Sequence, residues 1–232
     1  MLARIVTWNV RSLRDDSRCI VAELAELAPD IVALQEAPRF LRSRTRLAAL
    51  ARRSGLLYCC GGGASAGTAL LTSFRVDVMR SSESLLPPSP RLHRRGVALA
   101  EVRLAGTEHV PLAVASVHLG LDAGERQRHA VFVNELVGAY QGAVGVVAGD
   151  LNEGQEGSAW QLLAAGRTDP GAAEARDTFP ASAPQHRIDV VLLPSGTRGH
   201  SRVVQTQRVV AASDHCPVVV ALDLASLPVT PA

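Results

Sequence analysis

The sequence predicts an α/β (α+β) protein in which mixed β-sheets form the core and helices pack outside them. Short β-branched runs alternate with amphipathic stretches, predicted strands outnumber predicted helices, and the two kinds of element do not alternate strictly. The chain has 232 residues and no long linker divides it. We therefore expect one domain over residues 1–232, with a core at about residues 4–222 and a loose tail at residues 225–232.

Two amphipathic helices are expected in the first half of the chain. The helix from Arg18 to Leu27 places Ile20 and Leu24 on one face, and the helix from Ser43 to Arg53 ends before a glycine. The proline-rich stretch LLPPSPRLHRR is expected to be a loop. Strands are expected at residues 3–10, 31–34, 56–60, 68–72 and 75–79, with a hairpin around GGGASAG.

In the second half, a long helix is expected at residues 123–140 and a short one at residues 158–165. Residues 166–186 are rich in Gly, Pro and Ala, which favours a loop. Strands are expected at residues 96–104, 110–117, 144–148, 188–193, 201–209 and 216–224.

Composition excludes several classes of chemistry. All 24 basic residues are arginine, so a Schiff-base lysine and a phosphate-loop lysine are both absent. The net charge is only +2, and aromatic residues make up 3%, so few side chains can stack on nucleic-acid bases. No apolar run is long enough to predict a membrane-spanning helix. The four cysteines lack metal-finger spacing and the first residues resemble a strand rather than a signal peptide, which favours a cytoplasmic protein.

Polar side chains stand at the ends of many predicted strands. A carboxylate beside an apolar run is costly unless it is paired or bound to a cation, so a group of them predicts one polar cluster at an edge of the core. Oxygen-rich clusters suit Mg²⁺ or Mn²⁺, whereas zinc sites usually contain more His or Cys. Together with histidines, such a cation is typical of water attack on a phosphoryl centre. The residues are Asn9, Glu36, His118, Asp150, Asn152, Asp189, Asp214 and His215.

Each of these residues also has a structural explanation when taken alone. Asn9 suits a helix cap or a turn, and Glu36 suits the start of a helix. Asp150 with Asn152 suits an Asx turn, and His118 suits a satisfied core histidine. The presence of the whole set favours a functional site.

Six short segments carry a family resemblance. TWN, LQE, SVHL, GDLN, TFP followed by RID, and SDH occur in this order between about Arg4 and Leu222. The ordered set resembles the endonuclease/exonuclease/phosphatase superfamily, which has the fold of pancreatic deoxyribonuclease. The resemblance implies a four-layer sandwich of two packed mixed β-sheets flanked by helices. It also implies a phosphoesterase that depends on Mg²⁺ or Mn²⁺.

The resemblance implies a role for each matched residue. Glu36 resembles the main metal ligand of the family, with Asn9 and Asp214 nearby. Asp150 and Asn152 resemble the pair that positions and activates the attacking water.

Three further matches concern the scissile phosphate. His215 resembles the histidine that serves there as acid/base or stabilises charge, and Asp189 resembles the carboxylate that orients it. His118 resembles the second histidine of the deoxyribonuclease and sphingomyelinase branches. Abasic-site endonucleases carry an acidic or amide residue where this chain has Arg11 and a tyrosine in place of His118, so the sequence departs from that branch.

Arginines are the expected contacts to substrate. Residues 37–76 hold seven arginines and no acid, which suits either a polyanion-binding surface or a solvated helix face. Arg94 and Arg95, in the loop before a strand, and Arg11 are candidate substrate-binding residues. We expect a phosphodiesterase acting on nucleic acid. The alternatives are a sphingomyelinase-like enzyme for phospholipid headgroups, an enzyme for other small phosphodiesters, and a catalytically silent binding module. The sequence does not give the oligomeric state, and a monomer is assumed.

Overall fold

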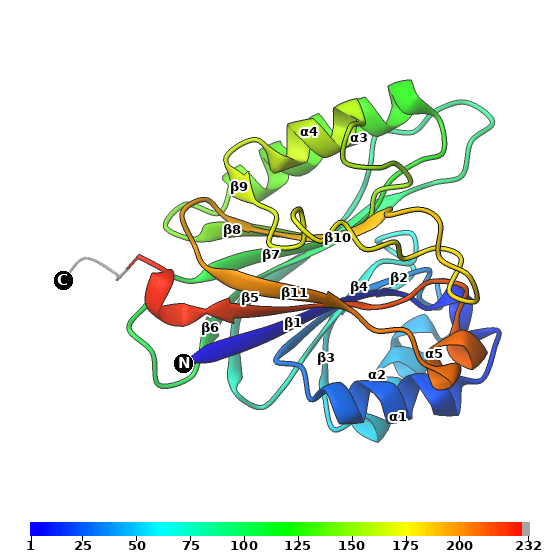
Figure 1. Cartoon of the computed structure of the whole chain (residues 1–232), viewed down its shortest axis with the longest axis horizontal. Helices are drawn as coiled ribbons and strands as arrows, with labels where there is room; N and C mark the ends of the chain where they lie inside the picture. The colour runs from blue at the N-terminus through cyan, green and yellow to red at the C-terminus, as the bar shows by residue number, and fades with distance from the viewer. Residues whose placement is uncertain (229–232) are drawn as a thin grey trace.

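Two six-stranded β-sheets pack face to face in the computed structural model, which describes residues 1–228 (Figure 1). The first sheet has the strand order β11-β12-β1-β2-β4-β3 and the second has the order β5-β6-β7-β8-β10-β9. The first sheet comprises β1 (Leu2–Asn9), β2 (Ile31–Gln35), β3 (Leu57–Gly61), β4 (Ala69–Thr72), β11 (Gly199–Val203) and β12 (Val218–Asp223). The second comprises β5 (Val76–Leu85), β6 (Gly96–Leu104), β7 (Leu112–His118), β8 (Val144–Asp150), β9 (Arg167–Thr168) and β10 (Asp189–Pro194).

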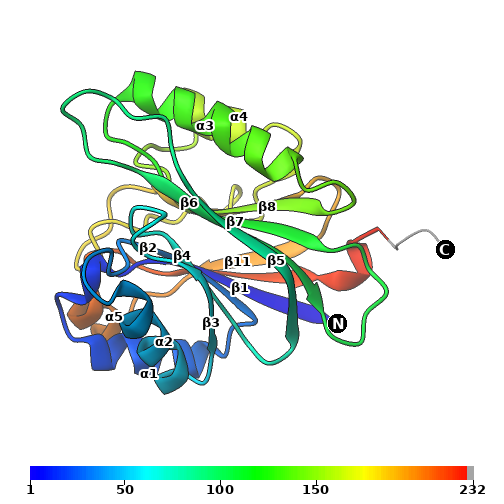
Figure 2. The same ribbon diagram turned by 180° about the vertical axis from the view of Figure 1, so that it is seen from behind.

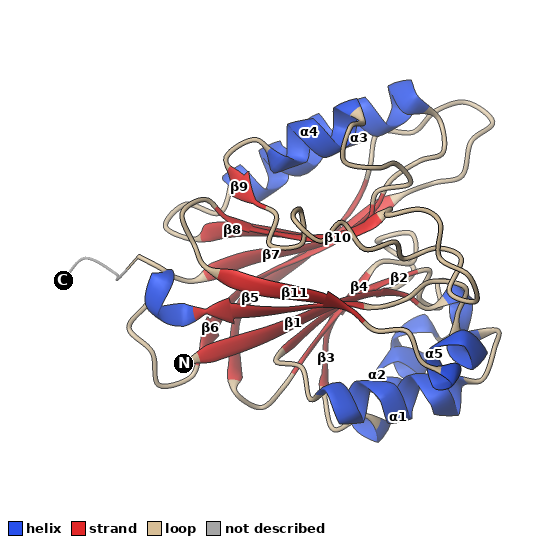
Figure 3. Cartoon of the chain, viewed as in Figure 1, coloured by secondary structure: helices blue, strands red, loops and turns tan. Residues whose placement is uncertain are grey.

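Helices form the two outer layers, as the colouring in Figure 3 makes plain. The outer face of the first sheet is covered by α1 (Ser17–Leu27), α2 (Ser43–Arg53) and α5 (Gln207–Ala212). The outer face of the second sheet is covered by α3 (Ala123–Gly138) and α4 (Ser158–Ala164). The view from behind in Figure 2 shows the same four layers. The expected four-layer sandwich of two mixed sheets is confirmed.

Apolar side chains on both faces of the strands explain the layering. In β1, Ile5 faces the core between the sheets, whereas Val6 and Trp8 pack beneath the helices. A sheet that is covered on both faces needs apolar residues at successive positions, so its strands lack a simple polar and apolar alternation.

The two sheets share one pattern of strand directions. Each has a single parallel pair at its centre, β1 with β2 in the first sheet and β7 with β8 in the second. The remaining neighbours in both sheets are antiparallel. A helix joins each parallel pair, α1 in the first sheet and α3 in the second. The carboxyl ends of both pairs lie at the same edge of the sandwich.

The expected strand at residues 201–209 is wrong in its second half. β11 ends at Val203, and residues 207–212 form α5. The Thr206 side chain accepts a hydrogen bond from the backbone of Val209, which caps the helix, and α5 packs against α1. The β-branched residues in this stretch favour a strand, so the sequence did not indicate the helix or its cap.

The loose tail expected from residue 225 was predicted to begin too early in the chain. Leu227 is buried against the core between the sheets, next to a short 3₁₀ helix (Leu224–Ser226). Residues 229–232 of the predicted tail lie outside the described residues. Over residues 1–228, none of the helices combines the length and the apolar character needed to cross a bilayer.

Candidate active site

Strand register brings the predicted polar residues together at one edge of the sandwich. Asp150 ends β8, where it lies opposite His118 on one side and Asp189 on the other. Asn9 ends β1, and Glu36 directly follows β2. Because both parallel pairs end at this edge, the side chains of their last residues lie close to one another.

A glycine allows β7 and β8 to come close at this edge. A Cβ atom on Gly149 would lie 2.0 Å from the carbonyl oxygen of Val117, which no side chain tolerates. In the GDLN segment, Gly149 therefore allows β8 to lie close to β7, and the next residue, Asp150, supplies the carboxylate.

Asn9 makes a polar contact between the two sheets at the site. Its amide nitrogen lies 3.1 Å from Asp150 Oδ2 and 3.4 Å from Glu36 Oε1. Its amide oxygen accepts the backbone N–H of Arg11 at 3.1 Å, which fixes the orientation of the amide. Glu36 itself has a left-handed backbone with φ of 47°. Such strain in a non-glycine residue often accompanies a functional site.

His215 forms a buried pair with Asp189. Its Nδ1 donates to Asp189 Oδ2 at 2.9 Å, and the Thr178 hydroxyl donates to the same oxygen at 2.6 Å. The Phe179 ring lies against the imidazole, with ring centroids 4.8 Å apart. Burial lowers the pKa of His215, but attraction and hydrogen bonding to Asp189, with further attraction to Asp150 and Asp214, outweigh it and raise the pKa to about 9.

His118 has the opposite surroundings. Burial lowers its pKa to about 3; Arg95 adds to this effect, and Asp150 opposes it. Arg95 Nη1 lies 3.1 Å from His118 Nδ1. Because a guanidinium has only donors, Nδ1 must accept this hydrogen bond, and the ring proton resides on Nε2. His118 Nε2 lies 3.4 Å from Asp150 Oδ2.

Asp150 stands at the centre of these contacts. Its Oδ2 also lies 3.8 Å from His215 Nε2, and its Oδ1 accepts the backbone N–H of Asn152 at 2.9 Å. Asn152 has a φ of 52°, and its side-chain amide donates to the Leu119 carbonyl at 3.0 Å. Both oxygens of Asp150 are therefore held in place from several directions.

A pocket of about 390 Å³ opens over this edge. Its lining includes Phe179 and Arg39, which were not among the predicted site residues. The TFP segment contained the signal for Phe179, and Thr178 beside it holds the Asp189–His215 pair. Predicted residues in the lining are Glu36, Arg95, His118, Asp150, Asn152, Asp214 and His215; Arg14, Arg39, His93 and Phe179 are additional.

Four predicted residues lie outside this lining. Asn9 and Asp189 are buried beneath it and act on its residues through the hydrogen bonds given above. Arg94 is exposed and lines a neighbouring groove. Arg11 pairs with Asp214, 3.3 Å from Nε to Oδ2, and with Asp15, so its charge is engaged by carboxylates rather than open to the pocket. Direct substrate contact by Arg11 and Arg94 stays a prediction.

The donor chemistry of the pocket fits a hard divalent cation. Glu36 and Asp150 are held side by side by one amide, and Asp214 opens on the same pocket. Adjacent carboxylates repel each other unless a cation lies among them, and oxygen donors suit Mg²⁺ or Mn²⁺. Asp150, Asp189 and His215 also place ligand atoms within 4.8 Å of one another, but the two latter are already paired. The carboxylates that face the pocket are therefore the better ligands.

A sandwich of two mixed sheets with carboxylates and histidines in a pocket at one edge is an arrangement suited to metal-assisted hydrolysis of phosphoester bonds. The chain belongs to the Endonuclease/Exonuclease/phosphatase family, whose model matches residues 6–215. The resemblance noted from the sequence is thereby confirmed. No curated protein sequence matches the chain significantly.

Solved structures share the fold at low sequence identity. A family member from Bacteroides vulgatus superposes with a TM-score of 0.79 at 16% identity, over 97% of this chain and 99% of that one. A mannosyl-6-phosphatase from Bacteroides thetaiotaomicron gives 0.80 at 16% identity, over 95% and 99%. TDP2 of D. rerio, complexed with a single-strand DNA product, gives 0.74 at 21% identity, over 96% and 99%.

Proposed function

We propose that this chain is a divalent-metal-dependent phosphodiesterase that cleaves a P–O bond by direct attack of water. The observation that carries the proposal is the pair of histidines that face Asp150 Oδ2 at 3.4 and 3.8 Å, in surroundings that shift their pKa values in opposite directions. Groups whose surroundings push their pKa values apart are suited to different steps of one reaction. All of these residues come from one chain, so the proposed site does not require a second copy.

His215 is the proposed acid. As an imidazolium it donates from Nε2 to the phosphoryl group and then delivers its proton to the leaving oxygen, while Nδ1 stays bonded to Asp189. Acid catalysis of this kind contributes about 10²–10⁴ in rate. Asp189 and Thr178 are positioning residues, because Asp189 bonds to the histidine and the Thr178 hydroxyl bonds to Asp189.

Asp150 and Asn152 are proposed to position the attacking water, and Asp150 accepts its proton. His118 stays neutral and offers Nε2–H as a hydrogen-bond donor to a phosphoryl oxygen. Arg95 fixes this tautomer and supplies a positive charge to the pocket. Its Nε has no hydrogen-bond partner among residues 1–228, which supports a contact to a bound phosphate.

Glu36, Asp214 and the Asn9 amide are the residues proposed to hold the metal ion. Held there, Mg²⁺ or Mn²⁺ would supply positive charge to neutralise and orient the phosphoryl group. The side chains of Glu36 and Asp214 open on the pocket, whereas Asn9 is positioned by the backbone of Arg11.

Nucleic acid is the first proposed substrate class. The arginines around the pocket support it, and the structurally similar TDP2 was solved with a DNA product. A phospholipid headgroup is the second candidate, because the exposed side chain of Leu121 lines the pocket and those of Phe40 and Leu92 line the adjoining groove. The four cysteines are all free, which supports a cytoplasmic location.

Hydrolysis of bis-p-nitrophenyl phosphate and of plasmid DNA, with Mg²⁺, Mn²⁺ or EDTA, tests the proposal. We expect metal-dependent turnover that Asp150→Ala abolishes, while the matched variant Asp77→Ala, at an exposed position in β5, keeps it. Turnover that survives in Asp150→Ala would refute the mechanism. A salt titration then separates the substrates, because cleavage of nucleic acid should fall steeply with ionic strength and cleavage of the small ester should not.

A further inference from the structure

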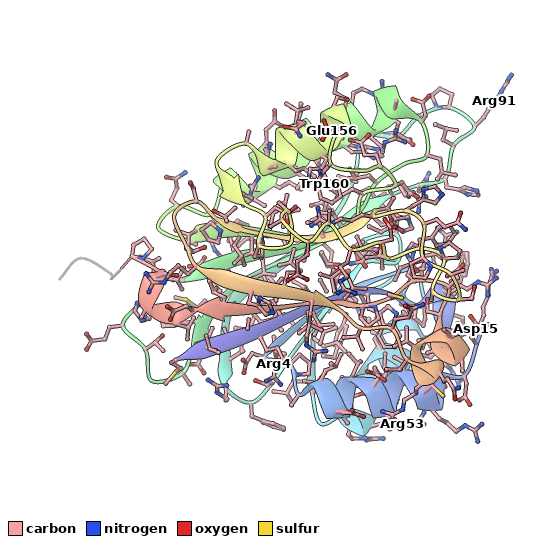
Figure 4. The ribbon with its side chains drawn as sticks, viewed as in Figure 1. Arg4, Asp15, Arg53, Arg91, Glu156 and Trp160 are labelled. Atoms are coloured by element: carbon pink, nitrogen blue, oxygen red, sulfur yellow. The ribbon has the colours of Figure 1, made fainter. Side chains whose placement is uncertain are left out.

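Two surface segments that flank the catalytic pocket carry a high positive charge. Residues 37–46 and 85–95, here called the rim, contain four and three arginines respectively and one histidine, with neither Asp nor Glu. Arg44 is paired with Glu83, and Arg95 is bonded to His118. The remaining charges face solvent, and Figure 4 shows Arg91 projecting outward at the end of the molecule away from the N-terminus.

A groove connects the two segments to each other and to the catalytic pocket. It has a volume of about 390 Å³, and Phe40, Leu85 and Leu92 form much of its apolar wall. Arg39 and His93 line both this groove and the catalytic pocket. A surface that binds to the rim is therefore in direct contact with the mouth of the site.

The rim also exposes large apolar side chains. Phe40 is 78% exposed and Leu41 is 87% exposed, next to each other at the tip of the first segment. Leu92 in the second segment is 45% exposed, and Leu121, which lines the catalytic pocket, is 70% exposed. Apolar side chains gathered at a functional mouth indicate that a partner covers them.

The identity of these side chains favours a bilayer over a polynucleotide. Leucines have no aromatic face on which a base could stack, and the guanidinium of Arg39 already lies over the Phe40 ring, 5.1 Å from its centroid. Arginines around protruding Phe and Leu residues suit an interface in which apolar side chains insert and cations contact anionic headgroups. We propose that the rim docks the catalytic mouth onto an anionic phospholipid bilayer.

This inference rests on the proposed function for the chemistry of the pocket. Of the two substrate classes proposed there, it favours the lipid phosphodiester over nucleic acid. The docking step itself involves no covalent chemistry. It can therefore be measured apart from catalysis, with a protein that does not turn over.

The chain provides a matched control for the Phe40 position. Phe74 is 77% exposed, but it follows β4, whose end lies opposite Ile31 at the start of β2, and so at the far end of the sandwich. Its neighbour Arg75 is paired with Asp30 at 3.1 Å. An equally exposed phenylalanine thus stands where no rim surrounds it.

The test is co-sedimentation with vesicles of phosphatidylcholine alone and of phosphatidylcholine mixed with phosphatidylglycerol. We expect binding to the anionic vesicles only, weakened about tenfold or more in Phe40→Ser/Leu41→Ser and unchanged in Phe74→Ser. Arg42→Gln/Arg91→Gln should weaken it too and make the remaining binding less sensitive to salt. Asp150→Ala should bind as the wild type does, which separates a failure of docking from a failure of the proposed catalysis.

Three results would overturn the inference. If the wild-type protein does not bind to anionic vesicles, the proposed docking surface does not exist. Equal loss of binding in Phe40→Ser/Leu41→Ser and Phe74→Ser shows that exposure alone, and not the rim, accounts for it. Binding to single-stranded DNA that competes with the vesicles and is lost in the arginine variant, but retained in Phe40→Ser/Leu41→Ser, assigns the rim to a polynucleotide instead.

Discussion

The two sheets end their central parallel pairs at the same place but deliver different side chains there. In the first sheet, β1 and β2 supply Asn9 and Glu36. At the corresponding positions of the second sheet, β8 ends in Asp150 and β7 ends in His118. The antiparallel neighbour of each pair begins near the site as well, with Asp189 in β10 and with the Asp214–His215 segment before β12.

The comparison shows how one backbone pattern divides the chemistry of a site. The first sheet supplies oxygen donors suited to a cation, whereas the second supplies a neutral histidine and carboxylates suited to protons and water. His215 is the exception that joins them, because it comes from the first sheet and bonds to Asp189 of the second. Changes on the two sides should therefore fail in different ways.

Of the changes that compare the two sheets here, the largest effect is expected from Glu36, which follows β2 of the first sheet. Glu36→Gln removes a ligand charge, so we expect kcat/KM for bis-p-nitrophenyl phosphate to fall about 100-fold or more, with partial recovery at high Mg²⁺. His118→Gln, on the second sheet, should lower activity without changing the Mg²⁺ concentration needed. If the two variants need the same Mg²⁺ concentration for activity, metal binding cannot be assigned to the first sheet alone.

A smaller effect is expected at Thr178, which supports the second sheet. Thr178→Val removes the hydroxyl that donates to Asp189 Oδ2 at 2.6 Å, so we expect kcat to fall about tenfold with KM little changed. Thr178→Ser keeps the hydroxyl and should restore most of the rate. A Val variant and a Ser variant with equal rates would show that packing, and not the hydrogen bond, is what matters.

The two histidines should titrate differently in the metal-free protein. Because its pKa is raised to about 9, His215 favours the folded state below about pH 6.5 and loses this contribution as pH rises through 9. His118, with its pKa lowered to about 3, favours the folded state above about pH 6.5 and loses this contribution as pH falls toward 3. Imidazole NMR signals followed from pH 5 to 10 should show His215 titrating at the alkaline end and His118 remaining neutral. Coincident titrations near 6.5 would refute the contrast.

The smallest effect is expected far from the site, at Glu23 between α1 and α5. Burial raises the pKa of this carboxyl, against the opposing attraction of Arg208, whose Nη1 is 3.6 Å away. Its raised pKa costs stability as pH rises above about 4.5, so Glu23→Gln should raise the unfolding free energy at pH 8 by about 1 kcal/mol or less. Thermal unfolding at pH 4 and pH 8 measures this, and an equal shift at both values would contradict it.

Residues at strand ends were predictable from the sequence because apolar runs locate the strands and polar residues mark their ends. His118, Asp150 and Asp189 are of this kind, and strand register alone places them side by side. The contact between Arg95 and His118 was not predictable, since it depends on the antiparallel register of β6 with β7.

Other features lacked a periodic signal. Residues 166–186 were expected to be a loop throughout, but Arg167 and Thr168 form β9. Phe179 lies in the segment between β9 and β10, where neither helical nor strand spacing constrains the chain. In α5, valines that suit a strand are instead held in a helix by the Thr206 cap and by contact with α1. Tertiary packing overrides local preference there, which a reading of short windows does not detect.

The pairing of β1 with β12 has a consequence for the synthesis of the protein. These strands lie side by side in the first sheet, yet about two hundred residues separate them along the chain. During synthesis on the ribosome, one edge of β1 has no partner strand until β12 emerges. Unpaired strand edges can pair with strands of other chains. His215 lies in the segment that leads into β12, so the proposed acid joins the other site residues only after the last strand of the first sheet has been synthesised.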